Sequence, residues 1–189
     1  MNNWNEFIWP LLATTSEDMR TVQIGLRNGA VARPVFPAAE GDLLASRIQD
    51  AIDVALPGDL IVIAPGTYEE NVIMWKPVKL QGWGAGAVTI NARQVPTEKI
   101  ANWQIKVNQL LDDGLIDLLP GQENAALAGF VALGAALFPT EEGAGIFVAG
   151  KATGAERFNI PLNKGARIDG LTIVGASQGG AIMVNGYAS

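Results

Sequence analysis

Short apolar segments between residues 60 and 90 are the feature that most limits what this chain can fold into. The segments are Leu60–Ile63, Val72–Met74, Val78–Leu80 and Val88–Ile90. The connections between them hold turn-forming and charged residues and are too short for a helix. Apolar residues two positions apart point to the same side of a strand. The pattern therefore predicts a series of short strands, each with one apolar face.

A short helix is predicted before these strands. Ile48, Ala51, Ile52 and Ala55 recur at helical spacing, and Pro57-Gly58-Asp59 then ends the helix and turns the chain. Taken alone, a helix followed by four short strands also fits an ordinary antiparallel meander with tight turns.

The residues from Ser46 to Asn91 resemble the start of a right-handed parallel β-helix of the pectate-lyase-like superfamily. The resemblance lies in the predicted helix, in PGDLIVIAPGTYEENV and in KPVKLQGWG. It implies a solenoid in which the helix covers the open end and the alternating apolar side chains fill the interior. The expected fold class is therefore mainly β: a truncated right-handed single-stranded parallel β-helix with an N-terminal capping helix and a long, partly helical insertion.

The alternation stops after Asn91 and resumes at Ala166. Between them, Thr97–Leu111 has the spacing of an amphipathic helix, Ala125–Phe138 is continuously apolar, and Gly145–Val148 fits a strand. The apolar run is shorter than the ~20 residues that span a bilayer, which favours a buried helix over membrane insertion. The resumed segment is expected to repeat earlier strands one turn further along. The expected register places Leu171 and Ile173 on Val78 and Leu80, and Ile182 and Val184 on Val88 and Ile90.

The first 28 residues resemble a different family. NNWNEFIWPLL and TSEDMRTVQIGL are similar to a segment near the C-terminal end of the permease subunits of maltose-type sugar ABC transporters. This change of resemblance suggests a fusion or a misassembled reading frame, and deletion of residues 1–40 is then expected to cost less than about 1 kcal/mol. The alternative is a genuine N-terminal element that packs across the β-helix mouth. The predicted organisation is a permease-like segment (1–28), a connector (29–41), a cap with the first turns (42–91), an insertion (92–165) and a resumed, truncated turn (166–189).

Composition excludes several classes of site. The chain has no Cys and no His, which removes disulfides, thiolate and imidazole metal sites, and every mechanism based on these side chains. Its net charge of −6 argues against a nucleic-acid partner. The apolar part of the N-terminal segment is interrupted by Pro10 and has no basic region before it, so neither a stable membrane anchor nor a signal peptide is predicted in this chain.

Low-specificity candidates for binding a polysaccharide are Arg167, Asp169, Trp83 and Tyr187. Arg167 and Asp169 flank Ile168, so both are expected to face outward, and the aromatic rings offer surfaces on which a sugar can stack. The competing interpretation is a solvated ion pair and ordinary packing aromatics. No residue is predicted to be catalytic or to bind a metal, and Ca²⁺ enters as a cofactor only through the family resemblance.

The expected function is that of a non-catalytic β-helix module, glycan-binding or structural, in a secreted or cell-surface bacterial protein. The chain ends at Tyr187-Ala188-Ser189 without a capping helix, which suggests a cut solenoid with an aggregation-prone last turn. The first alternative is therefore a fragment of a polysaccharide lyase or glycoside hydrolase whose catalytic turns lie beyond Ser189. A weaker alternative is a component related to the sugar transporter permease.

The 189-residue chain is predicted to show no turnover of polygalacturonate or comparable glycans, with or without Ca²⁺. The reason is that the sequence offers no candidate set of side chains that would both abstract a proton and stabilise the resulting charge. An assay for unsaturated products and reducing ends measures this. Turnover that disappears in Asp169→Ala would contradict the prediction.

Overall fold

The computed structural model describes residues 24–25, 31–118, 143–154, 157–158, 166–176 and 180–185. Two helices lie within these ranges, α2 (Arg47–Val54) and α3 (Thr97–Asp112). The strands are β1 (Ile24–Gly25), β2 (Val31–Val35), β3 (Leu60–Ile63), β4 (Gly66–Tyr68), β5 (Val72–Met74), β6 (Lys79–Gly82), β7 (Val88–Asn91), β8 (Ile146–Val148), β9 (Arg167–Asp169), β10 (Thr172–Val174) and β11 (Ile182–Val184). The described part of the chain is therefore mainly β, as the sequence predicted.

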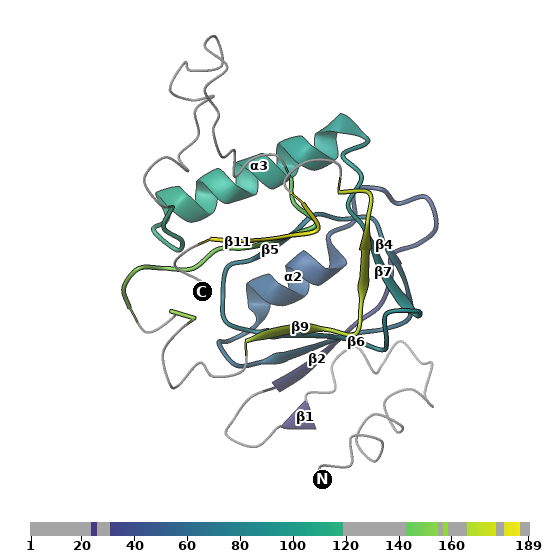
Figure 1. The fold of residues 1–189 in the computed structure, drawn as a ribbon, viewed down its shortest axis with the longest axis horizontal. Helices are drawn as coiled ribbons and strands as arrows, with labels where there is room; N and C mark the ends of the chain where they lie inside the picture. The colour runs from purple at the N-terminus through teal and green to yellow at the C-terminus, as the bar shows by residue number, and fades with distance from the viewer. Residues whose placement is uncertain are drawn as a thin grey trace.

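These strands form three sheets with the orders β1-β2-β3-β6-β9, β10-β7-β4 and β11-β8-β5. All neighbours pair in parallel except β1 and β2, which are antiparallel. A parallel pair needs a long crossover between its strands. Here the crossover from β3 to β6 consists of β4 and β5, which lie in the other two sheets, so consecutive strands occupy the three sheets in turn (Figure 1).

The main core lies between the three sheets, and α2 covers it. Side chains at alternate positions of each strand point into this space, as Ile61 and Ile63 of β3 do. From α2, Ile48 and Ile52 join the same cluster and are fully buried. In Figure 1, α2 accordingly lies inside the ring of strands, and it contacts β2, β3 and β5.

A second core lies on the outer face of the sheet formed by β5, β8 and β11. Ile73 and Phe147 point away from the main core and pack against Trp103 and Val107 of α3. The rings of Trp103 and Phe147 lie 5.9 Å apart between centroids and are tilted. Because both of its faces are covered, β5 is buried at all three of its positions.

The expected register is wrong, although the resumed segment does pair in parallel. Leu80 pairs with Ile168 on β9, whereas Thr172–Val174 pairs with β7 in a different sheet. Strand β11 pairs with β8 rather than with β7. The pairings are displaced by one strand because β9, whose single apolar residue gives no alternation, lies beside β6, and because β8 lies within the predicted insertion.

Five residues of the stretch predicted to be a connector form β2, which pairs with β3. Ala32 and Val35 are buried. The buried carboxylate of Asp59 accepts hydrogen bonds from the backbone N–H of Val31 at 2.8 Å and from Nε of Arg33 at 3.0 Å, and it also accepts one from the backbone N–H of Leu56. Deleting residues 1–40 removes this strand, so we expect a larger loss of stability than the sequence suggested.

Asp59→Ala is expected to lower the free energy of unfolding by roughly 3 kcal/mol, because it leaves the Val31 and Leu56 donors and the Arg33 guanidinium without their acceptor. Denaturant unfolding measures the change. The control is Asp42→Ala, which removes an exposed carboxylate and should change stability by less than about 0.5 kcal/mol. Equal effects of the two substitutions would show that Asp59 does not fix β2 to the sheet.

Candidate functional site

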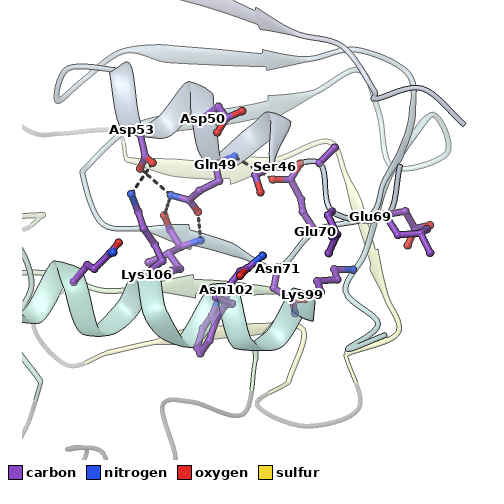
Figure 2. Close-up of a pocket in the computed structure, with 16 residues that line it drawn as sticks. Ser46, Gln49, Asp50, Asp53, Glu69, Glu70, Asn71, Lys99, Asn102 and Lys106 are labelled. Carbon is purple, nitrogen blue, oxygen red and sulfur yellow. Dashed lines mark hydrogen bonds and ion pairs between the residues drawn. The ribbon is translucent and has the colours of Figure 1, made fainter. Parts of the chain in front are cut away.

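A polar cleft of about 240 Å³ lies between α2 and α3 (Figure 2). The loop before α2 and the residues between β4 and β5 complete its walls. The polar side chains around it are Ser46, Gln49, Asp50, Asp53, Glu69, Glu70, Asn71, Lys99, Asn102, Lys106 and Gln109. Four of these carry carboxyl groups and two carry ammonium groups. Leu43, Leu44, Ala45, Ile73 and Trp103 also line the cleft, so it combines apolar surface with polar groups among which acidic ones are in excess.

Glu70 forms one end of the cleft and caps α2. Its Oε1 accepts a hydrogen bond from the backbone N–H of Ile48 at 2.9 Å, and its Oε2 accepts one from Gln49 at 3.1 Å. Ser46, at the N-cap position, makes no such bond with its side chain. A carboxylate at this position satisfies two free N–H groups and interacts favourably with the helix dipole. The cap of α2 thus comes from a residue beside β5 rather than from the helix itself.

Burial raises the pKa of Glu70 from its ordinary value of 4.5 to about 7, and the nearby charge of Asp50 adds to the rise. The two backbone N–H donors and the Lys99 ammonium act in the opposite direction. Burial also lowers the pKa of Lys99, against the influence of Glu69 and Glu70. The Lys99 ammonium donates to the carbonyl oxygen of Asn91 at 2.8 Å. Both residues are largely withdrawn from solvent.

Asp53 organises the opposite end of the cleft. Its Oδ1 accepts hydrogen bonds from Nε1 of Trp75 at 2.8 Å and from Nε2 of Gln49 at 3.0 Å. Its Oδ2 forms an ion pair with Nζ of Lys106 at 2.7 Å, which ties α2 to α3 (Figure 2). Because both partners of this ion pair are partly exposed, we assign it a positioning role rather than a large stabilising one.

Gln49 and Lys76 hold α2 against the strands. The Gln49 amide accepts a hydrogen bond from the N–H of Ile73 at 2.7 Å and donates one to its carbonyl oxygen at 3.2 Å. Because β5 ends its sheet, Gln49 thereby takes the place of a neighbouring strand. The Lys76 ammonium donates to the carbonyl oxygens of Asp53 and Ala55, both at 2.7 Å, at the C-terminal end of α2.

Asn71 connects the cleft to the strands that follow. Its Nδ2 donates to the carbonyl oxygens of Ala92, Gly143 and Ala144 at 3.3, 3.0 and 3.1 Å. The Oδ1 atom of Asn71 and the Nε1 atom of Trp103 are buried without a hydrogen-bond partner. The two N–H groups of this amide are shared among the three carbonyl oxygens, so the side chain joins segments that lie far apart in sequence.

The residues predicted from sequence lie away from this cleft. Arg167 and Asp169 are exposed on β9, 4.0 Å apart, and the Arg167 guanidinium donates to Oε1 of Gln81 at 2.6 Å. Trp83 follows β6 directly and is 41% exposed. Since Asp169 pairs with Gln81, these residues share one surface. Tyr187 lies outside the described residues.

Sequence reasoning missed Glu70 and Asn71, which it interpreted as turn residues. A Glu-Glu-Asn run between two strands has the composition of a solvated turn. The sequence gives no signal for the capping role of Glu70, because Ser46 before the helix is itself a preferred N-cap residue.

Comparisons with protein families, curated protein sequences and solved structures give no match to this chain. Within the described ranges, no helix is long and apolar enough to cross a membrane. Among the same residues, no three acidic, His or Cys side chains gather where they would bind a metal ion.

We expect the contribution of Glu70 to the free energy of unfolding to fall as the pH rises from about 4.5 to about 7. The folded state binds the Glu70 proton more tightly than the unfolded chain, so the contribution is complete below the unfolded pKa and is lost as the pH passes the folded pKa. Denaturant unfolding between pH 4 and pH 8 measures this dependence.

Glu70→Gln should flatten that dependence relative to the unsubstituted protein, because the amide does not titrate. The matched control, Glu40→Gln, replaces an exposed carboxyl group and should leave the dependence unchanged. If Glu70→Gln has the same pH dependence as the unsubstituted protein, then burial does not hold the proton on Glu70.

Proposed function

We propose that this chain is the helix-capped end of a right-handed parallel β-helix, a non-catalytic module that binds glycan in a secreted or cell-surface bacterial protein. The observation that carries the proposal is the cleft at the capped end, because several of its hydrogen-bonding groups have no hydrogen-bond partner among the described residues. The β-helix assignment rests on a separate observation, the passage of consecutive strands through three parallel sheets.

The bends that follow β6 and β9 lie against each other in successive turns, which supports the β-helix assignment. Gly82 ends β6, and Gly170 follows β9 at the corresponding corner of the next turn. A Cβ atom at Gly82 would lie 2.1 Å from the carbonyl oxygen of Gly170, so the two backbones approach as only glycine allows. The N–H of Gly84 donates to the same carbonyl at 3.0 Å. Successive turns that bend at the same place are typical of a solenoid.

The chemistry of the cleft favours a polyhydroxylated ligand. Ser46, Asp50, Asn102 and Gln109 line it, and their side chains make no hydrogen bond with the described residues. Together they offer hydroxyl, carboxylate and amide groups, which both donate and accept, as sugar hydroxyls do. Because carboxyl groups outnumber ammonium groups in the lining, a neutral or amino sugar fits the cleft better than an acidic one.

A catalytic role has one observation in its favour, the raised pKa of Glu70. A carboxyl group that holds its proton near neutral pH is the usual general acid of glycosidases. Yet both Glu70 oxygens already accept backbone hydrogen bonds, and the residue is only 4% exposed. A general acid has to reach the substrate oxygen. The capping contacts explain the burial of Glu70 without catalysis, so the enzyme fragment remains the second candidate.

Binding of soluble oligosaccharides tests the proposal. Chitohexaose and cellohexaose should bind, whereas an oligogalacturonate of the same length should bind at least tenfold more weakly because of the acidic lining. Titration calorimetry and chemical-shift mapping measure both affinity and location. Failure of both neutral ligands to bind at millimolar concentration would overturn the glycan-binding proposal.

Asn102→Ala should weaken this binding about tenfold, the effect of losing one side chain that hydrogen-bonds the ligand. Asn108→Ala is the matched control, because it removes the same amide from the same helix at a position outside the cleft. Equal losses in the two variants would place the ligand elsewhere. Product formation from either ligand would favour the enzyme fragment instead.

A further inference from the structure

The end opposite α2 presents the strand edges of β9, β10 and β11. Each of these strands is the last of its sheet in the described chain. An unpaired edge exposes a row of N–H and C=O groups that pair readily with another strand. The main core also opens here, because no described element covers this turn as α2 covers the first.

Apolar side chains of this turn are far more exposed than their counterparts in the turn before. Ile146 and Val148 on β8 are 0% and 5% exposed, whereas their register partners Ile182 and Val184 on β11 are 46% and 51% exposed. Ile173 on β10 likewise pairs with the fully buried Ile90 but is itself only half-buried. Within the described residues, the end face combines strand edges that pair with no further strand and an apolar centre, which is the composition of an interface.

The charged side chains of Arg167 and Asp169 determine which strand can pair favourably with the edge of β9. β9 reads Arg167-Ile168-Asp169, with Ile168 packed against the core and the two charged side chains exposed on the outer face. When β9 pairs antiparallel with a second copy of itself about Ile168, each Arg167 lies opposite Asp169 of the other copy. Opposite charges directly across two strands stabilise the pair, and like charges destabilise it. β9 is thus complementary to itself.

We propose that two copies of this chain associate end to end through this face, related by a twofold axis perpendicular to the coil. The axis reverses the strand direction, so β9 pairs antiparallel with β9 of the second copy, and β10 of each copy lies against β11 of the other. Ile182 and Val184 then become buried at the centre. Such an interface uses the same patch on both chains and closes after two copies.

The opposite end of the fold differs from this face. There, α2 covers the core, and Gln49 occupies both backbone hydrogen-bonding groups of Ile73 on the outermost strand β5. The edge of β5 is therefore occupied within the chain, whereas the self-complementary charges of β9 favour pairing with the same face of a second copy. The proposal is independent of glycan binding, because the cleft lies at the α2 end.

Charge exchange on β9 tests the pairing in sedimentation and light-scattering measurements of the full chain. The unsubstituted protein should be a dimer at micromolar concentration. Arg167→Asp and Asp169→Arg each place like charges opposite one another, so each variant alone should dissociate at least tenfold more readily. An equimolar mixture of the two should form a heterodimer, because every acid then faces an arginine. The doubly exchanged R167D/D169R chain should also recover the dimer.

These measurements distinguish specific strand pairing from non-specific association and from misfolding. Recovery in the mixture requires both single variants to be folded. Ile182→Lys should dissociate the dimer in any charge background, because it buries an ammonium group in the apolar centre. A monomeric unsubstituted chain at 100 µM would overturn the proposal, as would single variants that dimerise unchanged or a mixture that fails to pair. Loss of glycan binding without loss of the dimer would overturn only the proposed function.

Discussion

Both ends of α2 are held by side chains that come from the strand segments. Glu70 supplies the acceptors for the first N–H groups of the helix, and Lys76 donates to carbonyl oxygens at its last turn. In the other direction, the side chain of Gln49 on the helix hydrogen-bonds the N–H and the carbonyl oxygen of Ile73 on the edge strand β5. An eight-residue helix is marginal alone in water. Its stability therefore comes from the strands, and the core between the sheets is in turn covered by the helix. These contacts fix α2 against the strands, and the ion pair between Asp53 and Lys106 ties it to α3 across the cleft.

Much of the local structure follows from sequence. Leu60–Ile63 and Val72–Met74 are strands with the predicted bounds, and the predicted helix at Thr97–Leu111 extends one residue further. The register does not follow, because the same spacing of apolar residues two apart recurs in several strands and does not say which strands are neighbours. β4 was interpreted as part of a turn, since Gly66–Tyr68 has no alternating aliphatic residues. The later pairings were displaced by one strand because β9 was not expected, so β10 and β11 were assigned to β6 and β7 instead of β7 and β8.

The cleft was less predictable than the strands. The outward positions of Arg167 and Asp169 follow from alternation alone, and both are indeed exposed on β9. Glu70 acts on backbone groups more than 20 residues earlier in the chain, so its role depends on tertiary structure that periodicity does not encode. The same holds for Asn71, which donates to carbonyl oxygens of Gly143 and Ala144. Polar residues that look like turn formers thus became buried connectors once the sheets were in place.

The passage of consecutive strands through three parallel sheets is the central claim, and engineered disulfides test it directly because the chain has no cysteine of its own. Thr89 and Thr172 are register partners on β7 and β10 and point away from the core. Their Cα atoms should lie about 4.8 Å apart, within disulfide range. The T89C/T172C protein should therefore oxidise to an intramolecular disulfide without loss of stability. K79C/T172C joins strands of different sheets and should not oxidise in this way. Efficient cross-linking of K79C/T172C, with none in T89C/T172C, would contradict the three-sheet arrangement.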